Sequence, residues 1–215
     1  MPDIFDEVEQ DLRADQARAL LRRYGWVGIA GAVLIIAAVG GWEAWRAHLK
    51  AGREAEATLF LAAQRDAADP ARRDQAIAGF ARLAAQAGPG YRALARIDEA
   101  GLKDAAGDHA GAQALWDQVA ADPGADQLLR DTATLAAVSH APADADPAAL
   151  RNKVGPLTAP TNPLRSLALE QSALLDIRAG NLDRARESLR AITSDTTAPD
   201  PVRGRATALL QRLDA

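Results

Sequence analysis

Residues 107–124 read GDHAGAQALWDQVAADPG, and this stretch carries the pattern that decides the fold. A Gly-Asp pair opens it and an Asp-Pro-Gly turn closes it, and both combinations interrupt helices. Between the turns, Ala112, Trp116 and Val119 follow at intervals of four and three, so they share one face of a helix. The stretch predicts a helix over residues 109–121 that packs through one small and two large side chains.

The same face recurs at regular distances along the chain. Its copies are Ala76, Phe80 and Leu83; Ala112, Trp116 and Val119; and Ala185, Leu189 and Ile192. The first interval is 36 residues and the second is 73, about twice as long. The skipped unit near residues 148–154 is degenerate, because its expected large position is Lys153. A fixed interval of this size indicates a repeat, and the pattern resembles the second helix of a tetratricopeptide repeat.

Composition favours helices throughout. Alanine dominates the chain, aromatic residues make up 4%, and no sustained alternation of β-branched residues predicts a strand. Turn-forming residues divide the chain into segments with helical spacing. The expected helices span residues 43–67, 72–87, 91–105, 109–121, 125–140, 146–154, 163–179, 182–192 and 200–213. Paired in order, they predict an all-α fold of four tetratricopeptide-like hairpins and a terminal helix, an α-solenoid.

A long apolar stretch precedes the repeats. Residues 24–42 read YGWVGIAGAVLIIAAVGGW and contain no charged residue. As a helix they measure about 28 Å, close to the hydrocarbon thickness of a bilayer. Arg22 and Arg23 precede the stretch and Glu43 follows it, and aromatic residues of the kind that favour membrane interfaces lie at both ends. The expected interface residues are Arg22, Arg23, Tyr24, Trp26, Trp42 and Trp45. We therefore expect a tail at 1–23, one transmembrane helix at 24–42 and a repeat domain at 43–215.

Two other interpretations of this stretch stay open. Residues 38–40, Ala-Val-Gly, fit the cleavage site of a signal peptide, although the preceding tail carries six acidic residues and the apolar run exceeds a usual signal core. A buried core helix is the third interpretation, although such helices are shorter and amphipathic. The tail itself predicts an amphipathic helix over residues 3–23, which fits either a docking helix or a solvated one.

Charge and residue types exclude several classes of function. The net charge of −4 argues against a nucleic-acid surface, and the absence of cysteine excludes disulfides and thiol catalysis. His48, His109 and His140 form no metal-binding motif. The carboxylates at residues 98–99 are adjacent and therefore point in different directions on a helix. We expect no catalytic residues, no cofactor and no metal site.

The whole chain resembles one family more closely. It is similar to the ancillary SecYEG translocon subunits of bacterial inner membranes, because a short tail, a span that ends in Gly41-Trp42-x2-Trp45 and divergent tetratricopeptide-like repeats occur together. The tail sequence DIFDEVEQDLR at residues 3–13 is like the alphaproteobacterial branch. The resemblance implies a single-pass protein with a periplasmic repeat domain that associates with the translocon and with periplasmic chaperones. The alternative is a structural scaffold that self-associates through its span.

The charges beside the span predict its orientation. The tail carries four arginines, two of which abut the span, and the far flank carries Arg46, Lys50 and Arg53. Because the flank with more cations stays in the cytoplasm, the four arginines of the tail against three cations beyond the span, with Arg22 and Arg23 touching it, predict a cytoplasmic tail and an exported repeat domain. A reporter that is active only after export, fused after Ala215, should therefore be active in cells. An inactive reporter in a stably expressed fusion would reverse the orientation.

Overall fold

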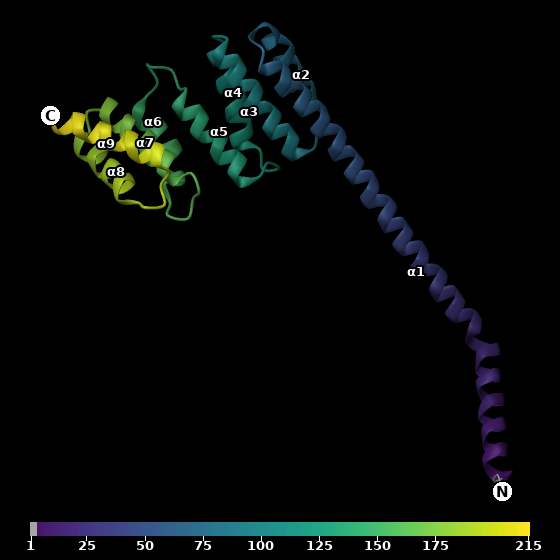
Figure 1. Ribbon diagram of the computed structural model, residues 1–215. Helices are drawn as coiled ribbons and strands as arrows, with labels where there is room; N and C mark the ends of the chain where they lie inside the picture. Colours follow the sequence, from purple (N-terminus) through teal and green to yellow (C-terminus); the bar gives the residue numbers. More distant parts are fainter. Residues whose placement is uncertain (1–3) are drawn as a thin grey trace. The chain divides into compact units, whose positions relative to one another are not determined.

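The computed structural model describes residues 4–215, except for the side chains of residues 4–25, 27–30, 32 and 49 (Figure 1). Its contacts divide the chain into two units. One ends at Ala55 and consists of the greater part of the first helix, and the other spans Glu56–Ala215. The second unit holds the repeats.

The residues that the structure describes form helices and no strand, which confirms the all-α prediction. A single helix, α1, covers the predicted tail, span and first repeat helix. The elements are α1 (Ile4–Ala67), the 3-10 helix η1 (Pro70–Arg72), α2 (Arg73–Gln86), α3 (Pro89–Ala105), α4 (His109–Ala121), α5 (Gln127–Ser139), α6 (Pro147–Val154), the 3-10 helix η2 (Gly155–Thr158), α7 (Arg165–Arg178), α8 (Leu182–Ser194) and α9 (Asp200–Asp214).

Within the second unit, each helix from α2 to α9 packs against the next one in the chain (Figure 1). Every second helix is also in contact: α3 contacts α5, α5 contacts α7 and α7 contacts α9. The first helices of successive hairpins therefore lie together as one layer, which we call the inner layer. This is the arrangement of an α-solenoid, in which each hairpin contacts only its neighbours.

The hydrophobic core of the solenoid is divided into four clusters, each between one hairpin and the helix that follows it. Phe80 and Leu83 belong to the first cluster, and Trp116 and Val119 belong to the second. Val154 lies in the third, and Leu189 and Ile192 lie in the fourth. Every cluster includes at least one alanine that is almost fully buried, so the helices approach closely at those points.

Asp side chains and glycines set the helix boundaries. As N-caps, Asp108, Asp126 and Asp146 accept hydrogen bonds from backbone N–H groups in the first turns of α4, α5 and α6. Gly107 and Gly180 have φ angles of 89° and 78°, which other residues rarely adopt. These two glycines end α3 and α7 and turn the chain into α4 and α8.

The degenerate third unit differs from the sequence expectation by one residue. Val154, not Lys153, occupies the large position, and it is fully buried between Leu150 and Leu157. Lys153 instead forms an ion pair with Asp117 of α4. The large buried residue of this unit therefore lies one position later in the chain than the repeat interval predicts, after a long loop between α5 and α6. Four residues before it, Leu150 stands where the other copies have alanine.

The repeat register predicts which alanine of α4 tolerates a large side chain. Ala112 is fully buried beside Ala100, whereas Ala114 on the same helix is exposed. Ala112→Trp should lower the free energy of unfolding by about 1–3 kcal/mol or more, because the ring overpacks a close helix contact. Ala114→Trp is the matched control and should unfold like the wild-type protein. Equal denaturation midpoints for the two variants, followed by circular dichroism, would contradict the register.

Candidate protein-interaction surface

The structure buries all nine residues singled out by the repeat pattern, with exposed fractions of 0–3%. They lie in three of the four core clusters and therefore pack the hairpins together. They belong to the core of the solenoid and not to its surface.

The sequence analysis missed the matching small residues on the first helix of two hairpins. Ala100 of α3 and Ala173 of α7 each lie twelve residues before the small residue of the partner helix, and both are fully buried. The two alanines are 73 residues apart, the same interval as Ala112 and Ala185. That shared interval is the signal that identifies them.

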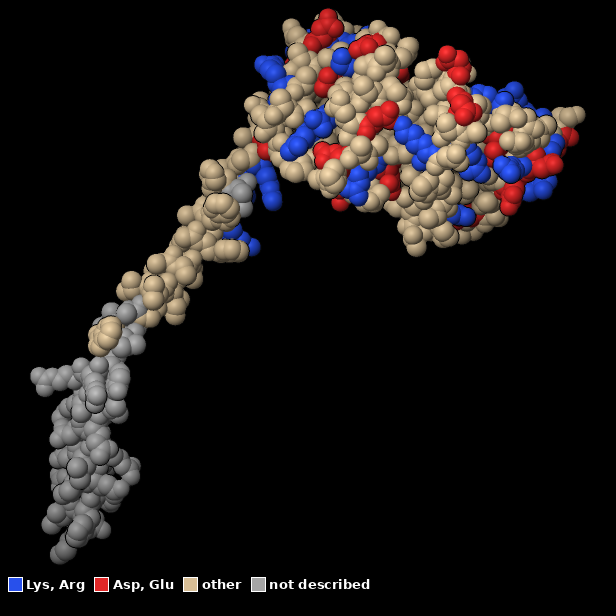
Figure 2. Space-filling model, turned by 180° about the vertical axis from the view of Figure 1, so that it is seen from behind, with Lys and Arg blue, Asp and Glu red and all other residues tan. Residues whose placement is uncertain are grey.

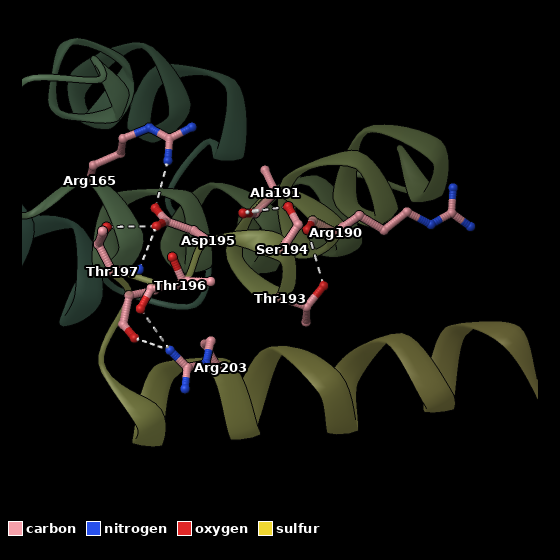
Figure 3. Close-up of polar contacts among 10 residues, drawn as sticks. Arg165, Arg190, Ala191, Thr193, Ser194, Asp195, Thr196, Thr197 and Arg203 are labelled. Atoms are coloured by element: carbon pink, nitrogen blue, oxygen red, sulfur yellow. Dashed lines mark hydrogen bonds and ion pairs between the residues drawn. The ribbon is translucent and has the colours of Figure 1, made fainter.

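The polar contacts within the expected turn between α8 and α9 are a second feature that the sequence did not indicate (Figure 3). The carboxylate of Asp195 accepts hydrogen bonds from the backbone N–H of Thr197 at 2.9 Å, from its hydroxyl at 2.6 Å and from the Arg165 guanidinium at 3.1 Å. These bonds, the Thr197 hydroxyl first, lower the pKa of Asp195. From α9, Arg203 donates to the carbonyl of Ala198 at 2.8 Å, so arginines hold the turn from two sides.

The turn between α4 and α5 repeats this construction 73 residues earlier. The carboxylate of Asp122 accepts a hydrogen bond from the N–H of Gly124 at 2.9 Å, and Arg130 donates to the carbonyl of Ala125. Both turns follow the pattern Asp-x2-Ala-x4-Arg, and in both the alanine is buried. The pattern marks the junction at which one hairpin passes to the next helix.

Buried carboxylates join helices elsewhere in the solenoid. The Arg205 guanidinium of α9 binds both oxygens of Glu170 in α7, at 2.6 and 2.7 Å. Arg151 of α6 donates to Asp176 of α7 at 3.1 Å. Because an unpaired buried charge is costly, these pairs favour one arrangement of the helices. These ion pairs give Glu170 and Asp176 a structural role.

Asp104 at the end of α3 binds two histidines. Its oxygens lie 2.7 Å from Nδ1 of His109 in α4 and 2.8 Å from Nδ1 of His140 after α5. The His140 ring also packs at a tilt against Trp116, with 5.0 Å between the ring centroids. The hydrogen bond with His109, more than that with His140, lowers the pKa of Asp104. One carboxylate therefore links three helices through two of the histidines noted in the sequence.

The inner layer contains a groove of about 570 Å³ between the end of α1 and α3. Phe80 of α2, which is buried, lies at its floor, and Ile97 and Leu102 of α3 line it. Among the described residues that line the groove, Asp98 alone is charged. Small residues leave the space open, namely Ala67, Ala68 and Gly101.

Two further hollows have a different character. A groove of about 480 Å³ lies between α1 and α2, where Leu59 is exposed beside Ala63 and Gly79. A third, of about 410 Å³, lies over α6, α7 and α8 and is lined by arginines. Two of these arginines, Arg151 and Arg165, already pair with carboxylates. On the face in Figure 2, basic and acidic side chains alternate over the repeats.

The predicted membrane-interface residues are described only in part. Trp26, Trp42 and Trp45 are exposed, and the Arg46 guanidinium lies 5.7 Å from the centre of the Trp42 ring. The side chains at 22–24 lie outside the described residues, as does the apolar stripe of the tail. Within the part of the chain that the structure describes, no helix combines the length and apolar character needed to cross a membrane. The span at 24–42 includes positions without described side chains and stays a prediction.

Consecutive hairpins with alanines at their close contacts place the second unit among the α-solenoids. A family model described as tetratricopeptide repeat-like domain matches residues 18–153, and the chain belongs to this family. No curated protein and no solved structure matches the chain significantly. Hairpin α7–α8 lies beyond the matched residues but has the same buried alanine pair as α3–α4.

The bonds of Asp104 predict a pH dependence of stability. The pKa of Asp104 is lower in the folded chain than in the unfolded chain. Its contribution to the free energy of unfolding is therefore present above the pKa of the unfolded chain, and it is lost as the pH falls through the pKa of the folded chain. Asp104→Asn should lower the free energy of unfolding at neutral pH by about 0.5–1.5 kcal/mol. The difference from wild type should shrink below pH ~4, where carboxylates become protonated.

Urea denaturation at several pH values measures this effect. Asp144→Asn, an exposed position in the α5–α6 loop, is the control and should follow wild type at every pH. A deficit of Asp104→Asn that stays constant down to pH 3 would contradict the assignment.

Proposed function

We propose that this protein is a membrane-anchored protein-interaction module, with residues 24–42 as its anchor and the inner-layer groove as its binding surface. The groove carries the proposal, because it is open to a partner and is lined by apolar side chains around a single carboxylate. Tetratricopeptide repeat-like domains commonly bind other proteins, which supports this use of the solenoid.

Exposed apolar residues support the anchor. Between positions 33 and 39, large aliphatic side chains are 58–71% exposed, and Trp42 follows them at 62%. These side chains are Val33, Leu34, Ile35, Ile36 and Val39. A contiguous apolar surface of this kind needs a cover, and its position within an uncharged stretch of nineteen residues favours lipid.

The partner class follows from the resemblance of the whole chain. A single span with a repeat domain beyond it is similar to the ancillary subunits of the SecYEG translocon. We therefore propose a place beside the translocon in a bacterial inner membrane, with the repeat domain in the periplasm. There the groove binds periplasmic chaperones, or the exported chains that they receive.

Gly101→Leu tests the groove directly. A Cβ added at Gly101 meets no atom within 4 Å, so the larger side chain narrows the groove without displacing the fold. Gly204 in α9 has equally open surroundings and lies outside the groove, which makes Gly204→Leu the matched control. Both variants should be at least as stable as wild type, because leucine favours a helix more than glycine does.

The measurement is crosslinking in native membranes, followed by identification of the adducts. Wild type and Gly204→Leu should give adducts with translocon or chaperone subunits, and Gly101→Leu should reduce the chaperone adducts at least fivefold. Undiminished adducts for Gly101→Leu would show that the groove is not the binding surface. Self-adducts alone would favour the scaffold alternative, and a chain that washes from the membranes would refute the anchor.

A further inference from the structure

We infer that the inner-layer groove accepts a lysine or arginine side chain of its partner, with the cationic group bound to Asp98 and the aliphatic part between the apolar walls. This inference rests on the proposed function and adds the chemistry of the bound segment. It selects partners by a positive charge within an apolar sequence.

Asp98 occupies an unusual position for a carboxylate. It is half-buried on α3, and it lines the groove together with Ile97, Leu102 and Phe80. Its hydrogen-bond partner is the Gln64 side chain of α1, which carries no charge. Burial raises the pKa of Asp98, and no cation of the described residues is among the groups that act against this effect.

Two cations on the same helix act on a different carboxylate. Glu99 follows Asp98 in the sequence and is 7% exposed, and Lys103 and Arg96 partly offset the burial that raises its pKa. Lys103 also binds Asp108 at 3.0 Å, and Arg96 lies 3.9 Å from Asp122. Other acids of the solenoid, such as Glu170 and Asp176, have their own arginines. Asp98 takes part in none of these ion pairs, so its charge is left for a ligand of the groove to neutralise.

The shape of the groove fits the same class of ligand. Lysine and arginine have an aliphatic stem that favours apolar contact and a charged end that needs a polar partner. The alanines and Gly101 leave room for such a stem, and Asp98 offers its carboxylate beside them. An ion pair in a partly desolvated groove is stronger than one in water, and an acidic ligand is repelled there.

Pools of immobilised nonapeptides test the inference with the full chain in detergent micelles. The pools differ only in the central residue, which is lysine, arginine, norleucine or glutamate, and the other positions hold mixtures of alanine, valine, leucine and serine. Norleucine has the stem of lysine without its charge. The wild-type chain should bind the lysine and arginine pools at least fivefold more tightly than the norleucine pool, and the glutamate pool least.

Asp98→Asn isolates the charge, because asparagine has the same shape and still accepts the hydrogen bond of Gln64. The variant should lose the preference for cations, with a lysine-to-norleucine ratio near one, and retain the norleucine binding. Asp144→Asn changes the net charge equally and should keep the wild-type ratio. A ratio that is the same in wild type and Asp98→Asn, or the absence of binding to every pool, would overturn the inference.

Gly101→Leu separates this inference from the proposed function. If it abolishes peptide binding while wild type binds lysine and norleucine equally, the groove is the interaction surface and the inferred charge recognition is wrong. If it changes neither peptide binding nor crosslinking in membranes, the groove is not the surface and the proposed function itself fails.

Discussion

The close approach of helices at buried alanines is the constraint on which the rest of the structure depends. Ala100 and Ala112 share one cluster, and Ala173 and Ala185 share another, all with no exposed surface. At Gly79 even a methyl group would lie 3.2 Å from the Cβ of Ala63, so α1 and α2 approach closely at this point. Because the backbones lie so close, two large side chains on the second helix of the hairpin, such as Trp116 and Val119, fill the space that remains.

Close packing of small residues gives core clusters with few large side chains. Ion pairs and hydrogen bonds therefore help to fix the position of each helix against its neighbours. Alanine contacts alone allow a helix to slide or rotate, whereas a buried ion pair has one correct arrangement. Glu170 and Arg205 set α9 against α7, and Asp104 with its two histidines sets α3, α4 and α5. The hydrogen bonds of Asp122 and Asp195 fix the turns that connect α4 to α5 and α8 to α9.

Local features of the sequence predicted the helices well, because the turns are encoded locally. Gly107 and Gly180 have the positive φ that the turn requires, and the helices around them begin and end close to the expected residues. The buried position of the third hairpin was harder to predict. Whether Lys153 or Val154 faces the core depends on the path of the preceding loop, which only the tertiary structure fixes. The groove was not predictable for the same reason: Asp98 and Gln64 are 34 residues apart in sequence and meet only after α1 and α3 pack.

The groove follows from the same alanine-rich composition that makes the core. Helices α1 and α3 pack over α2, and Phe80 fills the space beneath them. Above Phe80, Ala67, Ala68 and Gly101 leave a groove open between α1 and α3, since none of them has a side chain long enough to close it. A helix turns by about 100° per residue, so Glu99 points to the packed side of α3 while Asp98 faces the groove. Small residues therefore bring the helices together on one side and leave a groove open on the other, and Asp98 is the charged residue among those described that line it.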